Sequence, residues 1–184
     1  MNLLKFCSVA RLTHIANLSR YKLRNALSAS SFSRDPDDIL QKYIQAAKSN
    51  NEPEAEEILA YPEFTLVEVK DGTDSLGNSP LMLAAQRNWS DSCQSLIDIG
   101  CDVDHQNVFG STALMCSAAQ GHTDALETLL RCDRLDINLS SRFGQTALMK
   151  AILAGRIESV KILLDAGAAT EIHNKQGILI CPVD

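Results

Sequence analysis

A repeated motif is the feature that most constrains the fold of this chain. The segments 77–82, 110–115 and 144–149 read GNSPLM, GSTALM and GQTALM. Their glycines are 33 and then 34 residues apart, and Gly177 follows 33 residues later. Because a period between about 20 and 50 residues indicates one supersecondary unit stacked along the chain, the sequence predicts a repeat array.

Each unit carries the signals for two short helices. A residue that can cap a helix N-terminus opens each unit, at Ser79, Thr112 and Thr146. Pro80 suits the first helical position, where the missing N–H needs no partner. First helices rich in small residues are predicted through 81–85, 114–118 and 148–152, and second helices through 125–130 and 160–164. Glycines that allow a helix to end follow at positions 100, 121, 155 and 167.

These patterns resemble the ankyrin repeat. The resemblance lies in the motif around each repeated glycine, in AAQGH at 118–122 and in LLDAGA at 163–168, and it covers residues 74–173. It implies units made of a β-turn finger and two antiparallel helices. The expected fold class is therefore all-α, an α-solenoid of helix-turn-helix units. One repeat, 146–168, is also similar to vertebrate photoreceptor ankyrin-repeat proteins.

The chain departs from the family at one position in each unit. Where the family often has a histidine that ties neighbouring repeats together, this sequence has Met82, Met115 and Met149. Methionine fills space but cannot make that hydrogen bond. We therefore expect the repeats to be held more by packing than by polar contacts.

The repeat boundaries predict six segments. They are a basic arm at 1–34, a degenerate N-terminal capping repeat at 35–73, ankyrin repeats at 74–106, 107–140 and 141–173, and the truncated start of a further repeat at 174–184. The capping repeat should contain helices beginning near Asp35 and Pro53, with polar residues that shield the end of the stack. The short last segment suggests an incomplete or alternative transcript, or an edge that a partner completes.

Charge is distributed unevenly along the sequence. The formal net charge is -6, but residues 1–34 hold six basic and no acidic residues, which leaves -12 for the remainder. An acidic body disfavours binding to nucleic acid and makes a basic partner easier to imagine. The arm has the composition of a mitochondrial transit peptide, yet a helix would place Arg11 and Lys22 beside Leu4 and Leu18, so a disordered basic arm is the alternative. The expected location is cytoplasmic or nuclear, with a mitochondrial location as the alternative.

No catalytic, metal or membrane signal stands out. The six cysteines form no C-x-x-C pair, and we interpret them as reduced thiols of an intracellular protein. No stretch approaches the about 18 apolar residues of a membrane span. Asp98, Cys101, Asp102, Asp104 and His105 are close in sequence, but a polar loop explains them better than a metal site. Without a nucleophile elbow, phosphate loop or zinc-protease motif, we expect no enzyme activity, cofactor or metal.

The ankyrin resemblance implies a partner-binding concave face made of finger tips and first helices. Mapped by position, the candidate residues are Leu76, Asn78, Gln86, Arg87, Val108, Phe109, Arg142, Phe143 and Gln145, with Ser111 and Leu153 beside them. Leu76, Phe109 and Phe143 occupy the same place in successive repeats and would form an apolar stripe. The alternative is that they only pack the fingers against one another. For Trp89, a core or capping role is favoured over recognition.

The predicted function is a monomeric, non-catalytic scaffold or adaptor that binds a partner protein. Its stiff surface would lose little ordering entropy on binding. The alternatives are an ankyrin adaptor targeted to mitochondria and a truncated isoform with little function of its own.

Overall fold

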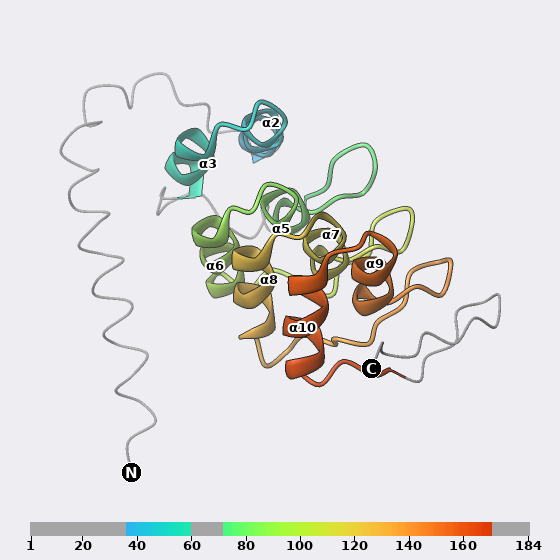
Figure 1. The fold of residues 1–184 in the computed structure, drawn as a ribbon. Helices are drawn as coiled ribbons and strands as arrows, with labels where there is room; N and C mark the ends of the chain where they lie inside the picture. Colours follow the sequence, from blue (N-terminus) through green and yellow to red (C-terminus); the bar gives the residue numbers. More distant parts are fainter. Residues whose placement is uncertain (1–35, 60–71, 171–184) are drawn as a thin grey trace, which may run out of the picture. The chain divides into compact units, whose positions relative to one another are not determined.

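The computed structural model describes residues 36–59 and 72–170, which contain helices and turns and no strand. The helices are α2 (Pro36–Lys48), α3 (Glu52–Leu59), α5 (Pro80–Ala85), α6 (Ser90–Asp98), α7 (Ala113–Gln120), α8 (Thr123–Leu130), α9 (Ala147–Leu153) and α10 (Ile157–Asp165), as Figure 1 shows. The all-α fold expected from the sequence is confirmed. The predictions for the basic arm and for residues 174–184 concern segments outside the described residues.

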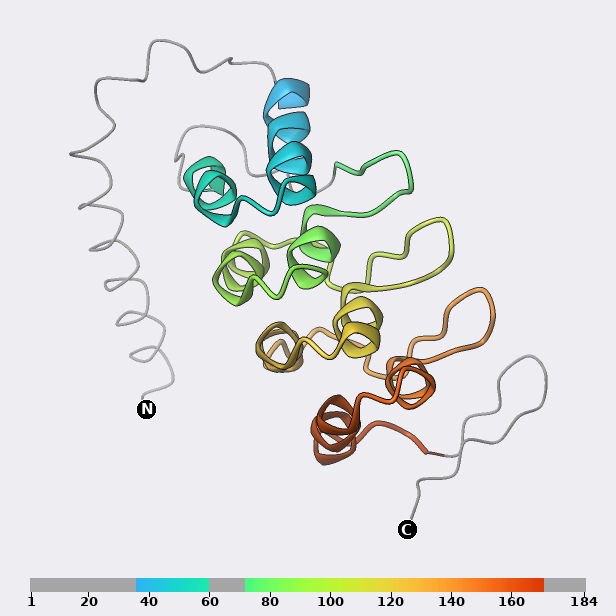
Figure 2. The ribbon, with the colours of Figure 1, turned by 45° about the horizontal axis from the view of Figure 1, so that its top comes forward.

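The helices of successive repeats stack in two rows. The first helices α5, α7 and α9 pack on one another in sequence, and the second helices α6, α8 and α10 form the other row (Figure 2). At one end α2 packs on α5 and α3 packs on α6. The loops before the first helices project away from the row of second helices (Figure 2). We call their tips, residues 74–78, 107–111 and 141–145, the first, second and third fingers.

Small residues allow the rows to pack closely. Ala84, Ala118 and Ala151 are fully buried in the first helices, and the methionines of the repeated motif are buried beside them. The second helices contribute large aliphatic side chains, with Leu96, Leu126, Leu129 and Leu163 fully buried. Trp89 is also buried, at the N-terminus of α6, which agrees with the core role predicted for it.

The predicted helix caps are present. The hydroxyl oxygens of Ser79, Thr112 and Thr146 accept hydrogen bonds from the backbone N–H of Met82 (3.4 Å), Met115 (3.3 Å) and Met149 (3.3 Å). Each bond satisfies one donor that the first turn would otherwise leave without a partner. The repeated Ser or Thr therefore fixes where the first helix of each repeat begins.

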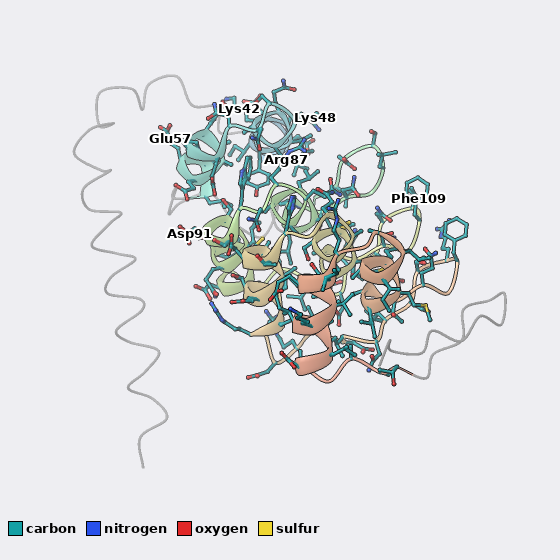
Figure 3. The ribbon with its side chains drawn as sticks, in the orientation of Figure 1. Lys42, Lys48, Glu57, Arg87, Asp91 and Phe109 are labelled. Carbon is teal, nitrogen blue, oxygen red and sulfur yellow. The ribbon has the colours of Figure 1, made fainter. Side chains whose placement is uncertain are left out.

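Polar side chains join neighbouring repeats in addition to the packing expected from the sequence. Side chains near the end of the first helix reach backbone carbonyl oxygens of the preceding unit: Arg87 Nε to Ala47 (2.8 Å), His122 Nδ1 to Ala85 (3.1 Å) and Arg156 Nε to Ala119 (3.2 Å). Figure 3 shows Arg87 between α5 and α2. These contacts tie the stack together where methionine has replaced the expected histidine.

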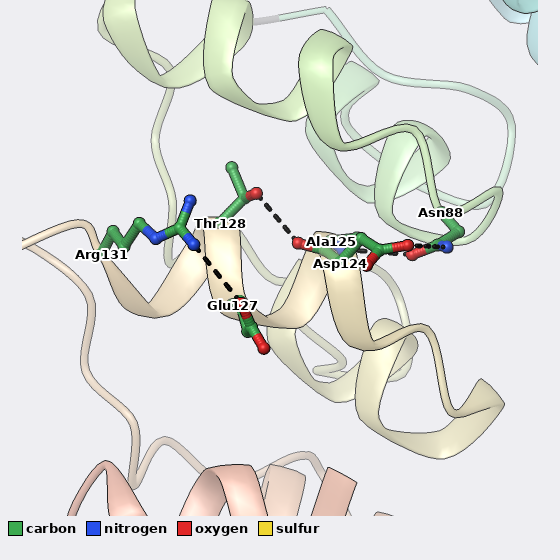
Figure 4. A network of polar contacts seen from close by, with 6 residues as sticks. All are labelled: Asn88, Asp124, Ala125, Glu127, Thr128 and Arg131. Carbon is green, nitrogen blue, oxygen red and sulfur yellow. Dashed lines mark hydrogen bonds and ion pairs between the residues drawn. The ribbon is translucent and has the colours of Figure 1, made fainter. Parts of the chain in front are cut away.

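Asn88 connects two repeats through the start of α8. Its Nδ2 donates to Asp124 Oδ2 (2.9 Å), and its Oδ1 accepts the backbone N–H of Ala125 (3.1 Å; Figure 4). His122, at the N-cap position of α8, makes no side-chain capping bond. Asn88 therefore caps a helix of the next repeat, while its own backbone is left-handed with φ 61°.

Replacing Asn88 with alanine should lower the free energy of unfolding by about 2 kcal/mol. About half of this loss comes from the missing capping contact. The other half comes from the left-handed backbone, which alanine tolerates less well than asparagine because its side chain cannot form a local hydrogen bond. Asn88→Gly is the matched control, because it loses the contacts but not the backbone compatibility, and it should cost about 1 kcal/mol. Urea unfolding followed by circular dichroism measures both variants. Wild-type stability in Asn88→Gly would show that the contact contributes nothing.

Candidate functional site

Each finger is a turn built around one polar side chain. Asp74, Asn107 and Ser141 each accept, through a side-chain oxygen, the backbone N–H groups two and four residues ahead, at 2.8 to 3.3 Å. Their own backbone N–H groups donate to the carbonyl oxygens of Asn78, Ser111 and Gln145. The three turns therefore share one conformation, although the residue whose side chain accepts these hydrogen bonds, the first of each finger, differs.

Backbone hydrogen bonds join neighbouring fingers. The N–H of Val108 donates to the carbonyl oxygen of Leu76 (3.1 Å), and the N–H of Arg142 donates to that of Phe109 (3.1 Å). Asn107 Nδ2 also donates to Asn78 Oδ1 across the first two fingers (2.8 Å). The spacing of the fingers is thus set by main-chain and amide contacts.

The apolar stripe lies exposed on these fingers. Leu76 and Phe109 are each 49% exposed, and Phe143 is 62% exposed. Figure 3 shows Phe109 at the tip of its finger, away from the helices. Six large apolar side chains are exposed in the described part of the chain, and four of them, with Val108 included, lie on the fingers. This exposure favours a binding surface over the alternative that the stripe only packs the fingers together.

Two of the candidate residues are not on the surface. Asn78 is 5% exposed and bonds to Asp74 and Asn107, and Ser111 is 6% exposed. Their polar groups hold the fingers together, which leaves them little exposed surface for contact with a partner. Gln145 is half-buried, while Arg142 is exposed beside Phe143. The sequence could not separate these positions, because all of them are polar loop residues next to the same glycines.

The first helices supply polar groups beside the fingers. Gln86 Nε2 donates to Cys116 Sγ of the next repeat (3.6 Å), and Lys150 Nζ donates to Ser111 Oγ (2.8 Å). Burial raises the pKa of the Cys116 thiol above its ordinary value, and the Gln86 hydrogen bond and the Lys150 charge oppose that shift in part. We call the exposed surface formed by the finger tips and these first-helix residues the finger face.

Lys150 and Cys116 were not among the predicted site residues. Lys150 is the one charged residue in the sequences of α5, α7 and α9, which are otherwise apolar or carry small and polar neutral residues. This single charge in otherwise uncharged helices was the sequence signal that could have identified Lys150. Leu153, placed beside the candidate surface by the sequence, is 67% exposed at the end of α9.

The acidic loop 98–105 serves structural roles. Asp104 accepts the backbone N–H of Asp136 through both carboxylate oxygens, and His105 Nε2 lies 2.9 Å from the carbonyl oxygen of Gly77. Burial raises the pKa of Asp104, and the hydrogen bond from Asp136 opposes that effect. Within residues 36–59 and 72–170, no group of three His, Cys, Asp or Glu side chains is placed to hold a metal ion.

Four of the six cysteines lie in the described segments. Cys93, Cys101, Cys116 and Cys132 form no disulfide bond within the described residues, while Cys7 and Cys181 lie outside them. Burial raises the pKa of Cys93 to about 12. Among the helices whose placement is described, none is long and apolar enough to span a membrane.

Two rows of short helices, with fingers projecting from one row, define a helical repeat protein. A family model for ankyrin repeats in three copies matches residues 43–140 and again residues 81–176. The chain belongs to the ankyrin-repeat family. Ankyrin repeats are general protein-interaction modules.

Two curated relatives show how the repeats recur in larger proteins. The chain is 30% identical over 112 residues to the human transient receptor potential cation channel subfamily A member 1, which covers 60% of this chain and 10% of the channel. It is 40% identical over 58 residues to the E3 ubiquitin-protein ligase XBAT33 of Arabidopsis thaliana, which covers 30% of this chain and 11% of the ligase. The matches thus span about a tenth of each relative.

Proposed function

We propose that this chain is a non-catalytic scaffold or adaptor that binds a segment of a partner protein on its finger face. The observation that carries the proposal is the apolar stripe of Leu76, Phe109 and Phe143. These side chains are 49% to 62% exposed, on fingers held by backbone hydrogen bonds. Exposed aromatic residues on a fixed scaffold are the usual anchors of binding energy. The finger face would therefore bind a partner as a preformed surface.

Preorganisation supports this role. The fingers share one turn conformation and are linked to each other, so binding would need little ordering of the backbone. Three fingers offer a modest area, at or below the standard interface of about 1,600 Å². We expect moderate affinity and, as the sequence predicted, a monomeric protein. A cytoplasmic or nuclear location, or a mitochondrial one directed by the basic arm, stays part of the proposal.

The proposed site is tested by removing the two aromatic anchors together. Phe109→Ala with Phe143→Ala should weaken binding of a captured partner protein by about 30-fold or more, because buried aromatic anchors each contribute on the order of 1–2 kcal/mol or more. The partner is identified by affinity capture on the full chain, and its Kd is then measured by surface plasmon resonance. Circular dichroism confirms that the variant is folded.

Ile157→Ala is the matched control. Ile157 is 71% exposed and apolar, but it begins α10, at the opposite end of the repeat from the finger. Its loss should leave the Kd within about twofold. Equal binding by the wild type and by the folded double variant would rule out the finger face as the site.

A further inference from the structure

Charged residues are segregated between the two rows of helices. The first helices α5, α7 and α9 contain no acidic residue. The second helices each contain two, at Asp91 and Asp98, Asp124 and Glu127, and Glu158 and Asp165. The six acidic residues of the second helices therefore lie on the row away from the fingers, while Asp74 in the first finger accepts hydrogen bonds from its own turn.

Cations beside the fingers have no carboxylate partner among the described residues. The ion pairs in this part of the chain are Lys42 with Asp38, Arg131 with Glu127 and Lys161 with Glu158, all on α2, α8 and α10. Arg87, Arg142 and Lys150 form no ion pair there. Arg87 and Lys150 each donate a hydrogen bond to a neutral oxygen, so their positive charges are positioned but not neutralised.

Arg142 lies in the third finger and Lys150 contacts the second, whereas Arg87 lies on the same side of the stack past the other end of α5. Arg142 directly precedes Phe143 and is bonded through its backbone to Phe109. Lys150 reaches from α9 to Ser111 in the second finger. Arg87 stands at the far end of α5, which at 1.5 Å per residue is about 9 Å from the helix start next to the first finger. An extended peptide advances about 3.3 Å per residue, so a few residues span this distance.

We propose that the partner segment on the finger face is an acidic peptide that also carries aromatic or aliphatic side chains. This inference rests on the proposed function and adds the chemistry of the partner. The apolar side chains lie against Phe109 and Phe143, while aspartate or glutamate side chains meet Arg87, Arg142 and Lys150. An acidic partner replaces the basic one suggested by the net charge, because the acidic residues of the second helices lie away from the finger face. The one acidic residue within the fingers, Asp74, is engaged in hydrogen bonds inside its own turn.

A peptide fits this surface better than a nucleic acid or a lipid headgroup. Among the described residues, three cations without an ion pair lie on the side of the first helices and fingers, and the body as a whole is strongly acidic, which repels a long phosphate backbone. A short segment with a few carboxylates gains the local attraction without approaching the acidic second helices. Electrostatic complementarity of this kind chiefly supplies specificity and faster association.

Selection from a display library of random peptides on the full chain tests the inference. Enriched peptides should combine Asp or Glu with aromatic or aliphatic residues, and their binding should require Phe109 and Phe143. One enriched peptide is then synthesised beside a copy in which every Asp is Asn and every Glu is Gln. The neutral copy should bind about tenfold more weakly, because exposed charge pairs each change affinity by a factor of about two.

The complementary change is made on the protein. Arg87→Gln, Arg142→Gln and Lys150→Gln together should weaken the acidic peptide about tenfold and the neutral copy hardly at all. Arg142→Gln alone should weaken binding of the acidic peptide about twofold. This change carries no risk to the fold, because the Arg142 guanidinium makes no hydrogen bond within the described residues. Raising the salt from about 0.1 M to about 1 M should also reduce binding of the acidic peptide. Arg131→Gln with Lys161→Gln removes two positive charges from the row of second helices and is the control, which should change binding little.

The outcomes separate this inference from the proposed function. Neutral or basic peptides that still require Phe109 and Phe143 would overturn the acidic preference and leave the finger face as the binding site. Acidic peptides that are indifferent to the triple variant would also overturn it. Enrichment of no peptide dependent on the two phenylalanines would count against the inference, while the captured-partner experiment judges the finger face by itself.

Discussion

Replacing Gly110 with alanine is expected to lower the free energy of unfolding by about 3 kcal/mol. Gly110 has φ +70°, and a Cβ there would lie 2.6 Å from the backbone nitrogen of Arg142 in the next finger. The left-handed backbone costs a non-glycine residue about 1–2 kcal/mol, and displacing a packed backbone adds about as much. Urea unfolding of the full chain measures the loss.

Gly155→Ala separates the two contributions. Gly155 has a similar φ of +65°, but no atom would lie within 4 Å of a Cβ added there. This variant should lose only the conformational part, about 1 kcal/mol. If the two variants were equally destabilised, close contact between the second and third fingers would contribute nothing to stability.

Leu126→Ala should cost about 3 kcal/mol and make unfolding less cooperative. Leu126 is fully buried in α8, which packs against both α6 and α10. The change leaves a cavity in the central repeat, and stability in a repeat protein depends on the interfaces between nearest neighbours. A urea titration should therefore show a lower midpoint and a shallower slope than that of the wild type.

The control for this core substitution is Leu153→Ala. Leu153 is 67% exposed, so the same truncation should change stability by less than about 0.5 kcal/mol. A loss below about 1 kcal/mol in Leu126→Ala, with an unchanged slope, would mean that the repeats on either side of α8 are not coupled through it.

The local signals in the sequence predicted most of the fold. The caps at Ser79, Thr112 and Thr146 act within three residues, and the period of the motif places them in register. The contacts of Asn88 could not be predicted in this way, since its partners lie 36 and 37 residues ahead in the next repeat. A side chain that acts between repeats has no partner in its own unit.

The candidate site was predicted in outline, with its apolar part better than its polar part. Phe109 and Phe143 are conspicuous in turns, where aromatic side chains have few places to be buried. The burial of Asn78 could not be predicted, because in the sequence an amide that bonds across fingers looks the same as one exposed to solvent. The proposed charge of the partner differs from the one suggested by the net charge, because a net charge averages over both rows of helices.

Contacts at the junctions between repeats differ in chemistry. Asn88 joins the first pair, whereas at the equivalent position Gly121 leaves room for Arg156, whose Cδ would lie 2.9 Å from an added Cβ. The units are consequently not interchangeable. A chain in which the repeats were shuffled or one was duplicated would bring mismatched edges together, so the linear order of the units is itself encoded in these side chains.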